Sequence, residues 1–156
     1  LPEFRKAMLE KAAHGTRDLD LTPRIMIDAE VNLEDVDWKL YDILQKFGPF
    51  GVGNDEPLYA ATGLTVISVD PVGKDNKHLR LNVKHNSHVV RKTIAFGFGD
   101  KKRHPSDWGA LKSGDRIDLA FSVGVNEWNG NRELQLMVED IKKTNTLSAP
   151  PAMAAE

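Results

Sequence analysis

The stretch from Phe47 to Pro57 most constrains how this chain can fold, because it separates two regions with different residue patterns. It holds three glycines, two prolines and one asparagine within eleven residues, and this composition sustains neither a helix nor a central strand. Phe47 and Phe50 are too apolar for a spacer that lies in solvent. The sequence therefore predicts an ordered, packed hinge over residues 47–57.

Before the hinge, residues 1–46 predict a connecting segment of helix, strand and helix. Residues 1–14 show roughly helical spacing of apolar residues, and Gly15 is a good C-terminal stop. Residues 24–29 cluster apolar and β-branched residues, which favours a strand. Asn32 can cap a second helix over about 33–46. Its predicted buried stripe comprises Val36, Leu40, Ile43, Leu44 and Phe47.

After the hinge, the apolar residues alternate with polar ones, as they do in strands with one buried face. The clearest case is 78–84, where Leu79, Leu81 and Val83 share one face. A bend or bulge is expected at Gly63, and Asn129 with Gly130 favours a tight hairpin. The five predicted strands are 58–69, 78–84, 89–96, 116–125 and 132–141.

Five short strands within about ninety residues favour a mainly β fold: a five-stranded OB-type barrel over 58–143, preceded by the short α/β segment. An SH3-like barrel or a small sandwich is the alternative. A short helical turn is expected around residues 106–108. The tail at 144–156, rich in Ala, Pro and Ser, is predicted to be disordered.

Charge is segregated along the chain although the net charge is only −2. Residues 1–57 carry seven Lys/Arg against twelve Asp/Glu, a balance of −5. From Lys74 to His104 there are nine Lys/Arg against two Asp, a balance of +7. Such a window is typical of an anion-binding face, although lysines that protect a solvated sheet edge would give the same pattern.

In an OB barrel, the solvent face of the second and third strands and the loops beside it form the usual ligand surface. Cations there would neutralise phosphates, and an exposed aromatic ring would stack on unpaired bases. Trp128 in a hairpin loop is the best candidate ring, unless it covers the barrel mouth. These contacts tolerate any base sequence. The candidate nucleic-acid-binding residues are Lys74, Lys77, His78, Arg80, Lys84, Arg91, Lys92 and Trp128.

No residue pattern predicts a catalytic or metal centre in this chain. There is no phosphate loop, no dinucleotide fingerprint and no arrangement of serine, histidine and acid typical of nucleophilic catalysis. The chain has no cysteine, which excludes disulfides and thiolate zinc sites. It also has no apolar run long enough to span a bilayer and no signal-peptide pattern, so no membrane association and a cytoplasmic location are expected.

Several phrases, taken in order, resemble the C-terminal part of RecJ-type single-strand DNA exonucleases over about residues 24–142. They are IDAEV at 27–31, GPFGVGN at 48–54, KHLRL at 77–81, NEWNG at 126–130, LQL at 134–136 and DI at 140–141. In that family a hinge phrase of this kind leads into an OB barrel. Asp55 stands where the family is expected to have proline.

The resemblance implies that the chain joins the end of a DHHA1-type domain, of which residues 1–46 would be the remnant, to the OB domain. The family's Asp-His-His and Gly-Gly-His motifs do not occur in this sequence. The implied parent is a 5′–3′ exonuclease of DNA repair and recombination, with Mn²⁺ or Mg²⁺ in its catalytic domain. Implied partners are single-stranded DNA, the remaining parent domains and a single-strand-binding protein. In the alternative reading, the barrel is a protein-interaction module that recruits such a partner.

Overall fold

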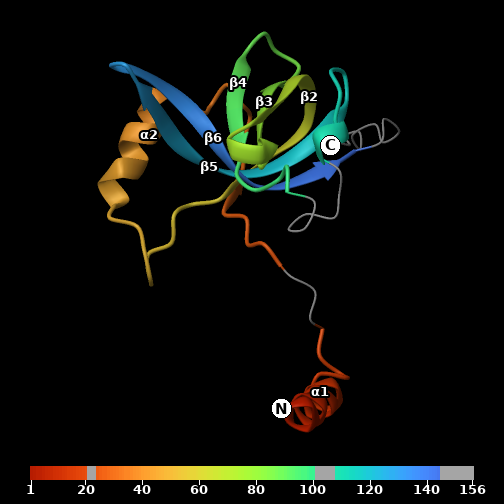
Figure 1. Ribbon diagram of the computed structural model, residues 1–156. Coiled ribbons are helices and arrows are strands. Elements are labelled where there is room, and N and C mark those ends of the chain that lie inside the picture. The colour runs from red at the N-terminus through yellow and green to blue at the C-terminus, as the bar shows by residue number, and fades with distance from the viewer. Residues whose placement is uncertain (21–23, 101–107, 145–156) are drawn as a thin grey trace, which may run out of the picture.

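The computed structural model describes residues 1–20, 24–100 and 108–144, and within them the dominant feature is a sheet that closes on itself (Figure 1). The strand order is β1-β2-β3-β4-β6-β5, and an additional pairing between β2 and β5 closes the ring. All neighbours in the ring are antiparallel except β4 and β6, which are parallel. The barrel strands are β2 (Tyr59–Val72), β3 (His78–Lys84), β4 (Val90–Ala95), β5 (Arg116–Trp128) and β6 (Asn131–Lys143).

The long strand β2 closes the barrel because it bends at Gly63. Its first part, from Tyr59 to Thr65, pairs with β5, and its second part, from Thr65 to Val72, pairs with β3. Gly63 has a φ of 62°, which favours glycine, and the register with β5 shifts between Ala61 and Leu64. The Gly63 N–H donates to Asp118 Oδ1 at 2.8 Å, which fixes the bend to the neighbouring strand. The predicted irregularity at Gly63 is confirmed.

Alternation along the strands fills the inside of the barrel with apolar side chains. Leu79, Leu81 and Val83 of β3 are at most 1% exposed, as the pattern predicts. Ile117, Leu119, Phe121 and Val123 of β5 face the same core. A mainly β, closed five-stranded barrel with this mixed order is an OB-type fold, and the predicted fold class is confirmed.

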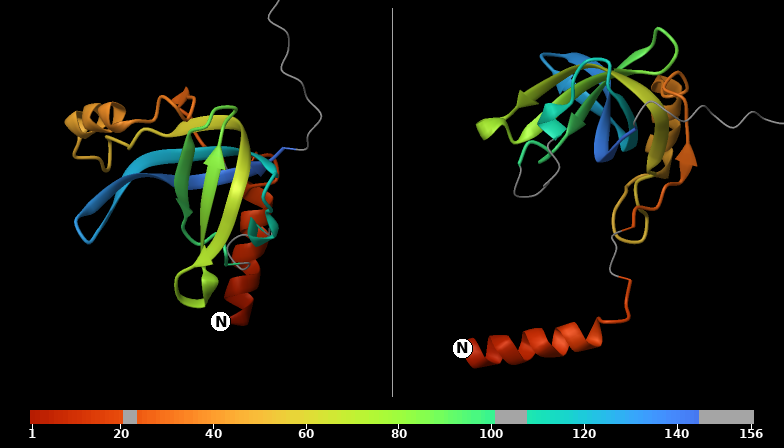
Figure 2. Two further views of the ribbon diagram at one scale, coloured as in Figure 1. Left: turned by 90° about the horizontal axis from the view of Figure 1, so that it is seen from above. Right: turned by 90° about the vertical axis from the view of Figure 1, so that its right-hand side faces the viewer.

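The helical segment before the barrel is shorter than predicted. The first helix, α1 (Pro2–Gly15), forms as expected but buries none of its residues, and it stands apart from the barrel (Figure 2). The second helix, α2 (Trp38–Leu44), begins after Asp37, whose carboxylate accepts the Leu40 N–H at 2.8 Å. The prediction that Asn32 caps a helix at residue 33 is therefore wrong, because Asp37 is the residue that satisfies the first N–H groups.

The predicted apolar stripe of this helix is only partly buried. Leu33 and Val36 are fully buried in the barrel core although they precede α2, and Leu44 joins them. By contrast, Ile43 is 41% exposed and Phe47, in the turn η1 (Gln45–Phe47), is 64% exposed. The residues before the hinge thus contribute directly to the core of the barrel.

Two further local predictions differ from the structure. The strand expected over 24–29 is reduced to β1 (Ala29–Glu30), which pairs in parallel with the start of β2. In the predicted hinge, Phe50 is half-buried but Phe47 is exposed, and hydrogen bonds of Asn54 join its two ends. The Asn54 amide donates to the Phe47 and Pro49 carbonyls at 3.0 and 2.9 Å, while Val52 is fully exposed. The polar side chain of Asn54 therefore orders the hinge, where we expected the apolar side chain of Phe47 to do so.

Short 3-10 turns occupy two connections of the barrel, η2 (Lys74–Asn76) and η3 (Trp108–Ala110). The rest of the helical turn expected at 106–108 lies outside the described residues, and so do the basic residues at 101–104 and the tail at 145–156. In the described part of the chain, no helix has both the length and the apolar character that crossing a bilayer requires.

We expect Leu81→Ala to destabilise the protein by about 2–5 kcal/mol, because it leaves a cavity where a fully buried side chain packed. Arg80→Ala, one residue away on the exposed face, should change the free energy of unfolding by less than about 0.5 kcal/mol. Urea denaturation followed by circular dichroism measures both. Equal losses in the two variants would contradict the assignment of faces in β3.

Candidate nucleic-acid interface

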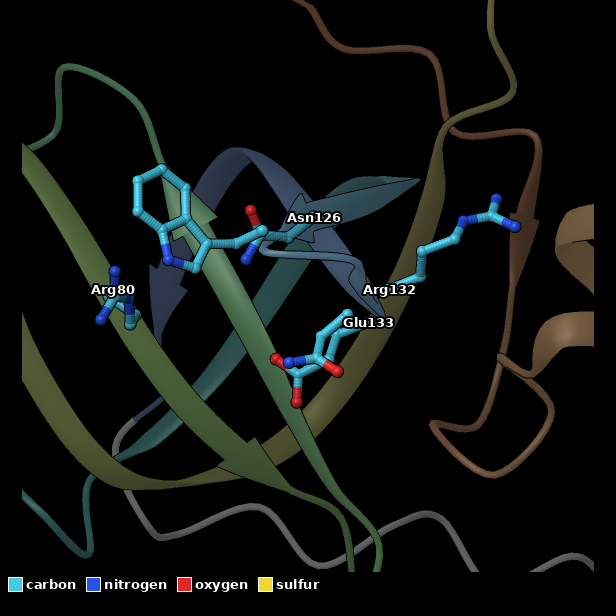
Figure 3. A pocket seen from close by; sticks show the side chains of 6 residues that line it. Arg80, Asn126, Arg132 and Glu133 are labelled. Carbon is cyan, nitrogen blue, oxygen red and sulfur yellow. The ribbon is translucent and has the colours of Figure 1, made fainter.

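An open groove of about 720 Å³ lies where the β5–β6 hairpin meets the outer face of the sheet (Figure 3). Arg80 contributes from β3, although β4 and β6 separate that strand from β5 in the sheet order. Figure 3 shows Arg80 and Asn126 on the groove and Arg132 directed away from them. The lining residues are Arg80, Asn126, Trp128, Asn131, Arg132 and Glu133.

Strand register explains why these side chains share one face. On β3, the side chains of Arg80, Asn82 and Lys84 alternate with the buried core residues. Asn82 pairs with Lys92 across the β3–β4 ladder, and Asn126 pairs with Glu133 across the β5–β6 ladder. Because directly opposed residues project to the same side of a sheet, the polar residues of four strands gather there.

The hairpin turn places Trp128 at the edge of the groove. Asn129 and Gly130 have φ values of 50° and 77°, as a tight two-residue turn requires, and Trp128 pairs with Asn131. The Trp128 side chain is 72% exposed, more than Trp38 at 40%. It therefore does not cover the barrel mouth, and its ring is available to a ligand.

The alternation of β3 predicts two cations on this face, Arg80 and Lys84. Arg80 is exposed and Lys84 is half-buried, and within the described residues neither forms an ion pair. An arginine beside an exposed indole can hold a phosphate while a base lies on the ring. Arg80 and Trp128 are therefore the residues of the groove best suited to bind a ligand that has both a phosphate and an aromatic base.

Lys92 lies on the predicted face but is already occupied. Its Nζ donates to both carboxylate oxygens of Glu133, at 2.8 and 2.7 Å. Both side chains are about half exposed, so the pair adds little to stability. The ion pair instead holds the Glu133 carboxylate in place among the residues that line the groove.

The remaining predicted residues lie at the start of β3 and in the turn before it. Lys74 and Lys77 are exposed, and Lys77 lies 3.8 Å from Asp75. His78 is half-buried, its Nδ1 accepts the Gly97 N–H at 2.9 Å, and its ring meets Phe96 edge-on. The imidazole therefore has a structural partner on this face.

Arg91 does not join the groove. It pairs with the buried Val83, so its side chain projects to the covered side of β4, and its Nε donates to the Leu33 carbonyl at 3.2 Å. A hydrogen bond from Ser87 lowers the pKa of Glu34 in the same region, with smaller contributions from its backbone, His85 and Arg91. Arg91 thus ties the segment before α2 to the barrel, and we leave it out of the interface.

Sequence reasoning missed four lining residues, Asn126, Asn131, Arg132 and Glu133, because no pattern says which loop residues face an adjacent strand. Arg132 places its guanidinium carbon 5.3 Å from the ring centroid of Trp38 and lies 3.8 Å from Glu127. This contact connects the hairpin to α2, which lies beside it (Figure 1). Nothing in the sequence indicates that Arg132 and Trp38, which are far apart along the chain, come into contact.

Metal ligands do not gather in the described part of the chain. No group of three or more His, Asp or Glu there could hold a metal ion. The carboxylates of Asp28 and Glu30 each accept a hydrogen bond, from the Leu58 N–H at 2.8 Å and the Thr62 hydroxyl at 2.6 Å. These two acids serve to dock β1 on β2.

The fold and the site together define an OB-type barrel whose outer face carries an open groove lined by an exposed indole and an arginine. The RecJ OB domain model matches residues 27–140, and the chain belongs to that family. This match covers the segment before α2 as well as the barrel. It agrees with the packing of Leu33 and Val36 into the core.

The chain is similar to one part of several longer proteins. It is 22% identical to the single-stranded-DNA-specific exonuclease RecJ of Bacillus subtilis and 25% identical to that of Haemophilus influenzae, in each case over 90% of this chain. It spans 17% and 23% of those two proteins. The crystal structure of RecJ from Thermus thermophilus with Mn²⁺ superposes with a TM-score of 0.63 at 21% identity, over 86% of this chain and 18% of that one.

We expect Trp128→Phe to remove most of the fluorescence that acrylamide quenches efficiently, because Trp128 is the most exposed tryptophan whose exposure is described. Trp38→Phe is the matched control, since Trp38 is partly covered by Tyr41 and Arg132. Stern–Volmer plots of both variants and the parent chain measure this. A larger loss of quenching in Trp38→Phe would show that the indole of Trp128 is covered in solution.

Proposed function

We propose that this chain is the single-stranded DNA-binding module of a RecJ-like exonuclease. The observation that carries the proposal is the exposed Trp128 in one groove with Arg80, on the face of an OB barrel. Bases of a single strand are unpaired and can lie on an indole, whereas duplex bases are already stacked on one another. Membership of the RecJ OB domain family supports the same ligand.

Binding would divide between two kinds of contact. Trp128 stacks on one base, which contributes about 1–3 kcal/mol and requires no particular base. Arg80 and Lys84, spaced along β3, neutralise phosphates and release the counterions bound there. Lys74 and Lys77 extend the positive face toward the β2–β3 turn. Both kinds of contact tolerate any base sequence.

In the longer parent, the module would hold a strand and direct it to a nuclease centre elsewhere in the chain. The relatives' printed names describe single-stranded-DNA-specific exonucleases, and the solved RecJ structures contain Mn²⁺ or Mg²⁺. The described residues offer no ligand set for such a metal, so no step of the proposed function here uses one. Roles in repair and recombination, and the recruitment of a single-strand-binding protein, belong to this proposal for the parent.

We expect Arg80→Ala and Lys84→Ala each to weaken binding to a labelled single-stranded oligonucleotide. Each should also reduce the slope of log K against log salt by about 0.7, because one phosphate contact is lost. Lys142→Ala is the matched control, since this exposed lysine lies at the end of β6 far from the hairpin. Fluorescence anisotropy over a salt series measures these values. Absence of binding by the parent chain at low salt, or binding that salt does not affect, would refute the proposal.

We expect Trp128→Ala to weaken binding by about 1–3 kcal/mol at every salt concentration while leaving the salt slope unchanged, because stacking releases no counterions. Trp128→Phe should retain part of the affinity, since a smaller ring still stacks. Both variants should melt at the parent's temperature. If Trp128→Ala instead reduced the salt slope, its indole would act by positioning a cation and not as a stacking surface.

A further inference from the structure

We propose that Glu133 makes the groove prefer single strands whose bases carry an exocyclic amino group, cytosine over uracil or thymine among pyrimidines. This inference rests on the proposed function, because it concerns the base that stacks on Trp128. It goes beyond that function, since neither the cations nor the indole can distinguish one base from another.

The position of Glu133 places an acceptor at the edge of the stacking surface. Asn126 is directly opposite Glu133 in the β5–β6 ladder, and Trp128 lies two residues further along the same face. Diagonal neighbours of this kind are about 7–8 Å apart, within the reach of long side chains. A base on the indole extends beyond it, so its polar edge lies over the neighbouring positions of the hairpin. All three residues line the groove.

The chemistry of Glu133 makes it selective. An ionised carboxylate only accepts hydrogen bonds, and its two oxygens together have about four acceptor positions. Lys92 occupies part of them, at 2.7 and 2.8 Å, and fixes the carboxylate in one orientation. The remaining lone pairs can accept from the N4 amino group of cytosine, a pairing that acidic side chains use in base recognition. Uracil and thymine present a carbonyl oxygen at that ring position, which the carboxylate repels.

The two asparagines beside Glu133 do not produce this preference. The side-chain amides of Asn126 and Asn131 carry both a donor and an acceptor, so each can turn to suit either edge. The discriminating group must be one that cannot donate, and among the described residues that line the groove Glu133 is the one acid.

The test compares oligo(dC) with oligo(dU), each of about 15 nucleotides, which is long enough for one OB-fold site. The two strands carry the same phosphates and lack the thymine methyl group, so the backbone contribution cancels in the ratio of their affinities. Anisotropy at a single salt concentration and at mildly alkaline pH, where cytosine is unprotonated, gives that ratio. We expect the parent chain to bind oligo(dC) about threefold to tenfold more tightly.

Glu133→Gln should bring the ratio close to one, because the amide can accept from cytosine or donate to uracil, and Glu133→Ala should do the same. Glu133→Gln should also bind both strands more tightly, since Lys92 becomes available to a phosphate. Glu139→Gln is the matched control: it removes the same charge from β6 at an exposed position that lines a different hollow with Met26 and Asp28, and it should retain the parent's ratio.

Equal affinity of the parent chain for both strands, or tighter binding of oligo(dU), would overturn the inference and leave the proposed function standing. Retention of the preference by both Glu133→Gln and Glu133→Ala would overturn the assignment to Glu133. If the parent chain bound neither strand at low salt, the proposed function itself would fail and the inference with it. Unchanged melting temperatures would confirm that each variant is folded.

Discussion

The bend of β2 at Gly63 is the constraint on which the rest of the structure depends. One strand pairs with β5 from Tyr59 to Thr65 and with β3 from Thr65 onward, so the two halves of the sheet can meet only if its direction changes along this stretch. A positive φ allows that change, and the bond from Gly63 N–H to Asp118 fixes it. Closure then decides which face of β3 is inside. Leu79, Leu81 and Val83 become core, and Arg80 and Lys84 must face outward.

Closure also determines where the ligand surface begins and ends. Strands β4 and β6 pair only at Thr93 with Leu136 and at Ile94 with Met137. The part of β6 before Leu136 therefore extends past this short ladder, together with the end of β5. The free end of this hairpin lies over the sheet's outer face and brings Trp128 into the same groove as Arg80. The contact of Arg132 with Trp38 links the hairpin to α2. The segment before the barrel therefore supports the site, although none of its described residues lines the groove.

The sequence predicted those features that depend on alternation and turn chemistry. The bounds of β3, the bulge at Gly63 and the hairpin at Asn129 and Gly130 all follow from local residue types. The sequence made Trp128 a candidate but left its exposure open, and the structure decides it. Features that depend on contacts between distant segments were missed. Val36 looked like part of a helix stripe and Leu33 like the start of that helix, yet both fill the barrel core. Asn54 orders the hinge in place of Phe47. The spacing of apolar residues along the chain does not show which distant segment will pack against each of them.

Electrostatics illustrates the same limit most clearly. A window with a balance of +7 predicts an anion-binding face, but adjacent Arg91 and Lys92 project to opposite sides of β4 and both have partners. Glu133, which pairs with Lys92, is 41 residues away and outside the basic window. The charge that a ligand meets is therefore set by pairing across strands and not by the sum along the chain. A groove assembled in this way contains a hydrogen-bond acceptor, the Glu133 carboxylate, as well as cations. It can therefore distinguish one base from another, which a uniformly positive surface cannot do.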